Sequence, residues 1–154
     1  MQQISRPGYH SLRAGRFSQQ NGIYFITATT HQRIPWFQVM SFASIVCRNL
    51  DQPNGLADAR NLCWVVMPDH VHLLLQLGSR PLNKVINQLK SRTARLLNRE
   101  IGRSGPFWSP GFYDHALREE EDMLNIARYI VANPVRAGLV SRVGDYPYWN
   151  AVWL

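Results

Sequence analysis

The sequence predicts an α+β fold with a ferredoxin-like split β-α-β core: a central antiparallel sheet, helices packed on it, and one added C-terminal helix. Three observations lead to this fold class. Segments rich in β-branched and aromatic residues alternate with segments whose apolar residues recur at helical spacing, two strands are separated by only a tight turn, and the expected order is β-α-β-β-α-β-α. Residues 1–154 are expected to form one domain, with a basic N-terminal arm at 1–21 and an aromatic tail at 141–154.

The first four elements follow from local composition. Residues 22–30 are rich in β-branched and aromatic side chains and predict the first strand, and residues 37–50 have the apolar spacing of a helix. Residues 62–67 and 70–77 predict two strands, because only the turn-forming pair Pro68-Asp69 separates these apolar segments.

The second half of the chain completes the sheet. Three successive leucines at 73–75 indicate a central strand that is covered on both faces. Residues 81–100 carry the strongest helical pattern, and residues 112–117 predict the last strand. Residues 119–133 predict the added helix, since its acidic first turn suits the helix dipole and Pro134 would end it.

Charge points to a polyanionic partner. Lys and Arg number 17 against 10 Asp and Glu, so the net charge is +7. No carboxylate precedes Asp51, and a second basic block covers residues 80–103. This excess makes a cationic substrate a poor match.

Composition also limits the compartment. The two cysteines exclude a disulfide framework and a cysteine-based zinc cluster, so a reducing environment is expected. The longest strictly apolar stretches, such as residues 62–67, are far shorter than the roughly 20 residues of a membrane helix. Residues 1–22 lack the apolar region of a secretory signal, so the expected location is the cytoplasm.

His70-Val71-His72 is the sharpest chemical motif. Alternate residues of a strand share a face, so the two imidazoles would stand about 7 Å apart, in the shape of a two-histidine metal clamp. The alternative interpretation is that the two histidines occupy every second position of the strand without binding a metal. Because the rest of this strand is nearly all aliphatic, two titratable rings on one face need partners, and a metal ion can satisfy both.

Tyr129 is the second candidate. At 100° per residue it lies on the polar face of the last helix, and Asn133 follows one turn later, near enough to reach the same point in space. An ordinary surface tyrosine and a helix-capping asparagine are the alternatives. The pair Asp114-His115 is a weaker candidate, since adjacent strand residues face opposite ways.

Together these motifs resemble one family, the REP-associated tyrosine transposases, bacterial relatives of single-strand insertion-sequence transposases in the HUH (His-hydrophobic-His) nuclease superfamily. The resemblance extends from about Tyr9 to the Trp-rich end of the chain. It rests on the basic helix and three segments: His70-Val71-His72, Gly111-Phe112-Tyr113-Asp114-His115, and Tyr129-Ile130-Val131-Ala132-Asn133-Pro134-Val135-Arg136-Ala137-Gly138-Leu139-Val140.

The resemblance implies an enzyme whose added C-terminal helix is catalytic, with Tyr129 as the nucleophile. It implies that His70 and His72 bind a divalent metal, Mg²⁺ or Mn²⁺, and that Asn133 stands where relatives place a third polar ligand, often glutamine. The implied activity is metal-dependent, sequence- and structure-specific cleavage and strand transfer of single-stranded DNA at repetitive extragenic palindromic (REP) hairpins, through a covalent 5′-phosphotyrosine.

The implied partner is the DNA hairpin, with no membrane and no obligatory protein partner. Insertion-sequence relatives work as dimers, but the predicted strands offer no readable dimer edge, so a monomer is preferred over a homodimer. When bound to DNA, the protein would be associated with the nucleoid. Charge and aromatic content predict the residues that contact DNA. They are Arg6, His10, Arg13, Arg16, Lys84, Lys90, Arg92, Arg95, Arg99 and Trp108.

Two other functions are weighed against this one. The first is a catalytically silent hairpin-binding module of the same fold. The second is a metal-dependent hydrolase of a small phosphate or ester, with His115 beside the histidine pair and a bound water as nucleophile. The aromatic tail at 141–154 either stacks on unpaired bases or packs against the domain.

Overall fold

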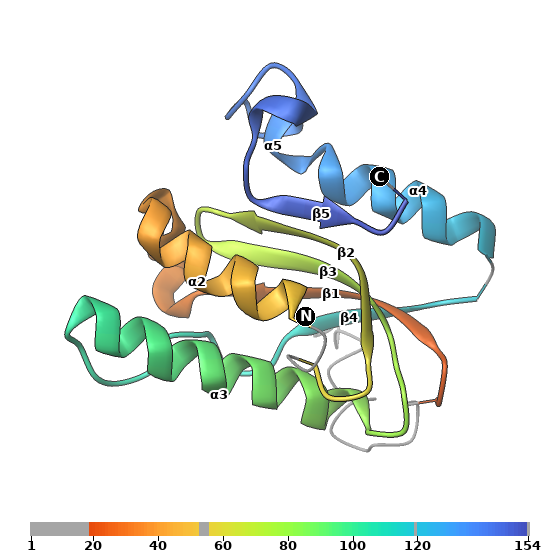
Figure 1. Ribbon diagram of the computed structural model, residues 1–154, viewed down its shortest axis with the longest axis horizontal. Helices are drawn as coiled ribbons and strands as arrows, with labels where there is room; N and C mark the ends of the chain where they lie inside the picture. The colour runs from red at the N-terminus through yellow and green to blue at the C-terminus, as the bar shows by residue number, and fades with distance from the viewer. Residues whose placement is uncertain (1–18, 53–55, 119, 154) are drawn as a thin grey trace, which may run out of the picture.

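The computed structural model describes residues 19–52, 56–118 and 120–153, which form a five-stranded sheet with helices on both faces (Figure 1). None of the described helices combines the length and apolar character that a membrane span requires. The elements are β1 (Ile23–Thr29), the 3-10 turns η1 (His31–Arg33) and η2 (Trp36–Gln38), α2 (Met40–Asp51), β2 (Arg60–Met67), β3 (His70–Gln76), α3 (Leu82–Ile101), β4 (Tyr113–Leu117), α4 (Glu120–Val131), α5 (Asn133–Arg136), η3 (Val143–Asp145) and β5 (Trp149–Ala151).

The strand order is β4-β1-β3-β2-β5, and every neighbouring pair is antiparallel. The first four strands have the ferredoxin-like arrangement, because α2 connects β1 to β2 and α3 connects β3 to β4 across the same face. The two-residue turn between β2 and β3 is present as expected. The predicted α+β fold is confirmed.

The two faces of the sheet have separate cores. Leu73 and Leu75 pack with α2 and α3, whereas Leu74 packs on the opposite face against Ala127 and Ile130 of α4. Figure 1 shows α2 beside α3 and, at the other side of the sheet, α4 running along β5. The prediction that the three leucines lie in a central strand covered on both faces is therefore confirmed.

We expect Leu74→Ala to lower the free energy of unfolding by about 2–5 kcal/mol, because it leaves a cavity between β3 and α4. Leu96→Ala is the matched control, since Leu96 on α3 is 36% exposed and its removal should change stability by about 0.5 kcal/mol or less. Urea unfolding of both variants measures the difference. Equal losses would contradict the place of Leu74 in this second core.

The C-terminal helix is shorter than predicted. The sequence pattern predicts one helix over residues 119–133, but α4 ends at Val131 and Asn133 begins the separate one-turn helix α5. Pro134 has no N–H to donate to the carbonyl four residues earlier, so the helical ladder is interrupted there. Because Ala132 keeps helical dihedral angles, the chain resumes a helix at once instead of stopping.

The aromatic tail packs against the domain. β5 adds an edge strand beside β2, with Trp149 opposite Val65 and Ala151 opposite Cys63. Tyr146 is buried, and its hydroxyl donates to the carbonyl oxygen of Val66. Of the two alternatives for the tail, most of it therefore packs against the domain, although the Trp153 side chain is 41% exposed.

Two of the residues expected to contact DNA have side chains that support the loop between α3 and β4. Trp108 is only 8% exposed, and its indole N–H donates to Oγ1 of Thr93 at 3.0 Å. The Lys90 ammonium donates to the carbonyl oxygens of Ser109 (2.8 Å) and Gly111 (2.6 Å), and burial lowers the pKa of Lys90 to about 8. The basic and aromatic pattern of the sequence does not show that this loop folds back over them.

Candidate active site

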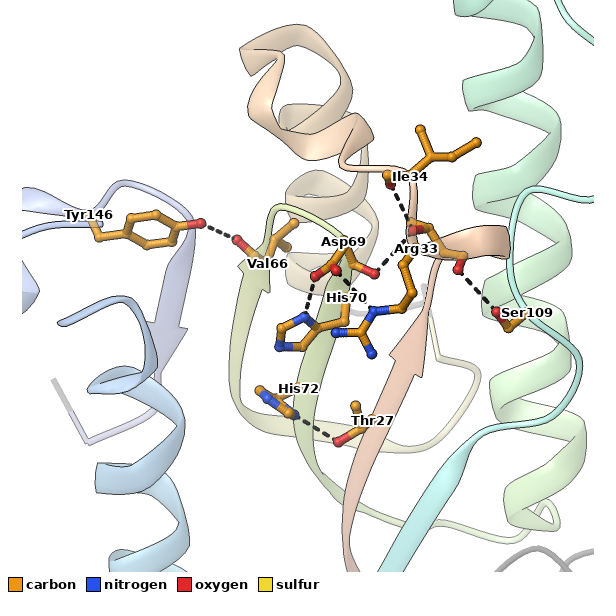
Figure 2. Close-up of polar contacts among 10 residues, drawn as sticks. Thr27, Arg33, Ile34, Val66, Asp69, His70, His72, Ser109 and Tyr146 are labelled. Carbon is orange, nitrogen blue, oxygen red and sulfur yellow. Dashed lines mark hydrogen bonds and ion pairs between the residues drawn. The ribbon is translucent and has the colours of Figure 1, made fainter. Parts of the chain in front are cut away.

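The two histidines open β3 directly after the β2–β3 turn. Both project from the face of the sheet that α4 covers, and their ring centroids are 4.7 Å apart. The rings are therefore closer than the backbone spacing alone suggests. Figure 2 shows them side by side at this end of the strand.

Each imidazole has one nitrogen engaged by a neighbouring side chain. Nδ1 of His70 donates to Oδ1 of Asp69 at 2.7 Å, and Nδ1 of His72 shares a hydrogen bond of 2.8 Å with Oγ1 of Thr27 (Figure 2). Metal-bound histidines are commonly oriented by such an outer partner, which leaves Nε2 for the metal. The Nδ1 contacts of both rings therefore fit a pair of Nε2 ligands.

The protonation of His72 also suits a ligand. Burial, with the charges of His70 and Arg136 adding to it, lowers the pKa of His72 to about 3. The ring is therefore neutral at pH 7, as metal coordination requires. The described residues contain no group of three His, Cys, Asp or Glu side chains that could hold a metal, so a third protein ligand would have to be of another type.

Asn133 is the candidate for that third ligand. It starts α5 and its side chain is half-buried. The N-cap of α5 is Ala132, which makes no side-chain cap hydrogen bond, so Asn133 is not the N-cap of this helix. An amide oxygen is a suitable ligand for Mg²⁺ or Mn²⁺, and the residues present therefore fit such an ion.

Tyr129 lies on α4, and its ring is close to that of His72. Its side chain is 48% exposed, and its ring centroid lies 6.4 Å from that of His72 and 6.2 Å from that of Phe25. The Arg136 guanidinium carbon lies 3.9 Å from the centre of the tyrosine ring, and Nη2 of Arg136 donates to the Tyr129 carbonyl oxygen at 2.6 Å. The ring is thus held beside the histidine pair while remaining accessible.

Asp69 connects the site to a second arginine. Partial burial raises the pKa of Asp69, but hydrogen bonds from His70 and Arg33 outweigh this effect and bring it below the usual value. Nε of Arg33 donates to Oδ2 of Asp69 at 2.9 Å, and Gln32 and Arg33 both have left-handed backbone angles with φ of 57°. Side chains of these types seldom adopt that conformation, and it is held here by hydrogen bonds from Thr30 to Ile34 and Asp69.

We expect Asp69→Asn and Thr27→Val each to weaken Mn²⁺ binding by about 10- to 100-fold, because each removes the group that orients one imidazole. Isothermal titration of the purified protein with Mn²⁺ measures the effect. Asp145→Asn is the matched control, since Asp145 pairs with Arg142 near η3. Unchanged Mn²⁺ affinity in the first two variants would contradict this role.

Three residues of the site were not singled out from the sequence. Thr27 and Asp69 reach the histidines only through strand pairing and the turn, so no sequence spacing indicates them. Arg136 shares the polar face of Tyr129 in the helical pattern, and that shared face was the available signal. His115 is exposed on β4 opposite Phe25, and its neighbour Asp114 is buried toward the other face, so these two side chains do not form a direct pair.

The basic residues of α3 are separated from the histidines by the sheet. Lys84, Arg95 and Arg99 are exposed, whereas Arg92 is half-buried and has a partner. α3 covers the face opposite the histidine pair. The remaining predicted contacts lie outside the described residues: Arg6, His10, Arg13 and Arg16.

Comparison with known proteins identifies the class first. The family model described as "Transposase IS200 like" matches residues 20–133, which is most of the chain and includes the histidine pair, Tyr129 and Asn133. The fold is therefore one that transposases of this class adopt. More particularly, the chain belongs to the family of IS200-like transposases.

Two individual relatives are likewise described as transposases. The chain is similar to the REP-associated tyrosine transposase of Escherichia coli K12, with 26% identity over 140 residues, 86% of this chain and 78% of that protein. It is 36% identical over 94 residues to a candidate REP-associated tyrosine transposase of Haemophilus influenzae. That match spans 54% of this chain and about half, 53%, of the relative. The resemblance to this group that the sequence motifs indicated is confirmed.

Solved structures show the same fold. A REP-associated tyrosine transposase bound to a REP hairpin superposes with a TM-score of 0.72 at 24% identity, covering 87% of this chain and 79% of that one. A structure assigned as a transposase from Deinococcus radiodurans R1 has a TM-score of 0.51 at 22% identity, covering 75% and 92% of the two chains.

Proposed function

We propose that this chain is a metal-dependent endonuclease and strand transferase that cleaves single-stranded DNA at REP hairpins through a covalent 5′-phosphotyrosine. One observation carries the proposal: two histidines, each with Nδ1 engaged, lie beside an exposed tyrosine that an arginine holds in place. The similarity to REP-associated tyrosine transposases, one of them solved with a REP hairpin, supports the choice of substrate.

Each residue has a defined task. His70 and His72, with Asn133, would hold Mg²⁺ or Mn²⁺, and Asp69 and Thr27 orient the two imidazoles. The bound ion supplies Lewis-acid polarisation of the scissile phosphate. Arg136 fixes the Tyr129 ring and adds positive charge where the phosphate must approach.

Tyr129 is the nucleophile. Its phenol loses a proton and Oη forms a bond to phosphorus, while the bond from phosphorus to the 3′ oxygen breaks and that oxygen takes a proton. The products are a 5′-phosphotyrosine and a free 3′-hydroxyl. Because the covalent link retains a phosphodiester, a 3′-hydroxyl of another strand can displace Tyr129 and rejoin DNA without a further energy source.

Recognition of the hairpin is assigned to surfaces away from the nucleophile. The exposed basic residues of α3, Lys84, Arg95 and Arg99, suit phosphate contacts, as does the charge of the N-terminal arm. The protein would act as a monomer, in the cytoplasm and on the nucleoid. A REP hairpin is then its partner, and no membrane or other protein is required.

The deciding experiment uses a synthetic REP hairpin with unpaired flanks, labelled at either its 5′ or its 3′ end. The protein is incubated with it in Mn²⁺ or in chelator, and DNA and protein are separated under denaturing conditions. We expect a nick and a protein–DNA adduct only with Mn²⁺, and we expect the adduct to carry the 3′ label, since the 5′ phosphate of the downstream fragment joins Tyr129.

The other results identify the rival functions. A metal-dependent nick without any adduct would assign the attack to a water molecule, as in a hydrolase. Tight hairpin binding with no nick in Mn²⁺ or Mg²⁺ would leave only the binding module. An adduct with the 5′ label would reverse the polarity proposed above.

A further inference from the structure

The sheet face that carries the histidines is covered unevenly by α4, which packs most closely over β2 and β3. On β2 and β3 the α4-facing residues Cys63, Val65 and Leu74 are fully buried. On the neighbouring strands the same face is less covered: Phe25 on β1 is only partly buried, and Tyr113 on β4 is 43% exposed. α4 therefore leaves a strip of β1 and β4 accessible beside the active site.

The exposed strip is aromatic and continuous with the active site. The ring centroid of Tyr113 lies 6.3 Å from that of Phe25, edge to face. Phe25 in turn stacks on His72 at 5.3 Å and meets the edge of Tyr129 at 6.2 Å. Exposed aromatic rings next to a group that attacks phosphodiesters are what unpaired bases need for stacking, and every base offers such a face.

A basic cavity lies at the far end of the same strip. It has a volume of about 500 Å³, and Arg60, Arg118, Gln76 and the exposed Trp153 line it. Among the described residues neither Arg60 nor Arg118 forms an ion pair. Tyr113 pairs with Thr27 and Leu117 pairs with Ile23, so the strip from Tyr113 to the cavity spans four residue steps, or about 13 Å.

We propose that this strip and cavity bind the unpaired DNA strand that flanks the cleaved phosphate. A base stacks on Tyr113, and the backbone or a terminal nucleotide enters the cavity, where Arg60 and Arg118 neutralise phosphate charge. The inference rests on the proposed function. The Lys90 contacts place the middle of α3 against the loop that precedes β4. β4 is an edge strand of the sheet. The unpaired flank of a hairpin bound to α3 would therefore pass around this one edge to reach the strip.

The test separates tail binding from hairpin binding. Equilibrium affinities are measured in chelator, so that no cleavage occurs, for a synthetic REP hairpin without a tail, with an unpaired tail on its 5′ side, and with one on its 3′ side. The variants are Tyr113→Ala, Tyr113→Phe and the double variant Arg60→Ala/Arg118→Ala. Arg142→Ala is the matched charge control, since Arg142 lies near η3 and pairs with Asp145.

We expect Tyr113→Ala to weaken binding of a tailed hairpin by about 5- to 100-fold, and Tyr113→Phe, which keeps the ring, to leave it unchanged. The double arginine variant should make the affinity for a tailed hairpin less dependent on salt. The slope of log affinity against log salt concentration should fall in magnitude by about 0.7 for each phosphate that the arginines neutralise. All variants should bind the hairpin without a tail as the parent chain does, and thermal melting confirms that each is folded.

Several results would overturn the inference. If the variants lose affinity equally for tailed and tailless hairpins, the substituted residues contribute to hairpin binding or to the fold. If the variants bind both tailed hairpins with unchanged affinity, the strip does not bind DNA. A loss in Tyr113→Phe would make the hydroxyl, not stacking, the active feature. If the parent chain binds the hairpin but neither tail raises its affinity, this inference alone is rejected. If the parent chain does not bind the hairpin, the proposed function is rejected as well.

Discussion

Tyr129→Phe is expected to abolish the protein–DNA adduct and to slow strand cleavage by about a thousandfold or more. The substitution removes only the oxygen that we propose attacks phosphorus, and it keeps the ring that packs against Phe25, His72 and Arg136. Because Tyr129 is half-exposed and its hydroxyl donates no hydrogen bond among the described residues, the fold should be unchanged. Single-turnover cleavage of the labelled hairpin in Mn²⁺ measures the loss.

Binding provides the internal control for this variant. Affinity for the hairpin and for Mn²⁺ should match that of the parent chain, since neither the histidines nor α3 is altered. Tyr148→Phe is the matched substitution, because Tyr148 packs against Tyr146 near β5, away from the histidines. If Tyr129→Phe still cleaved at the parental rate, the nucleophile would have to be another group, and the proposed mechanism would be rejected.

His70→Ala and His72→Ala are each expected to weaken Mn²⁺ binding by more than about 100-fold and to abolish cleavage. Each would remove a proposed direct ligand, so the loss should exceed that of Asp69→Asn or Thr27→Val, which act only on ring orientation. Titration with Mn²⁺ gives the affinity without any DNA present, so the result does not depend on turnover.

The variant His115→Ala tests whether the metal site consists of His70 and His72, as proposed, or also includes His115, as in the hydrolase hypothesis. His115 is exposed on β4 and lies on the same sheet face, so it is the matched histidine for Mn²⁺ affinity, which should be unchanged. A loss of Mn²⁺ affinity equal to that of His70→Ala would bring His115 into the metal site, as the hydrolase hypothesis requires. Parental Mn²⁺ affinity in His70→Ala and His72→Ala would contradict the metal site altogether.

The fold was largely predictable because its determinants are local. Alternating strands, the helical spacing of residues 81–100 and the two-residue turn at Pro68-Asp69 are each visible within a short window. β5 was missed, since a strand of three residues forms only by pairing with β2. The break at Ala132 was missed for the opposite reason: Pro134 indicates the end of a helix, whereas the chain turns into a second helix.

Burial is the second property that the sequence does not show. Trp108 and Lys90 carry the composition of a DNA-binding surface, and only the folded loop between α3 and β4 shows that one is in the core and the other bonds to backbone carbonyls. The place of α3 on the sheet face opposite the histidines was equally invisible, because sequence periodicity defines the apolar side of a helix but not the face of the sheet it covers.

The sequence alone therefore determined the fold class, the histidine pair and the polar face of Tyr129, because each depends on residues that are close along the chain. The tertiary structure decided which long-range partners complete the site: Thr27 through strand pairing, Arg33 through its left-handed turn, and Arg136 through the break between α4 and α5. It also decided that a strip of β1 and β4 stays accessible beside the site. Contacts of this kind depend on how elements pack, which no local pattern of residues records.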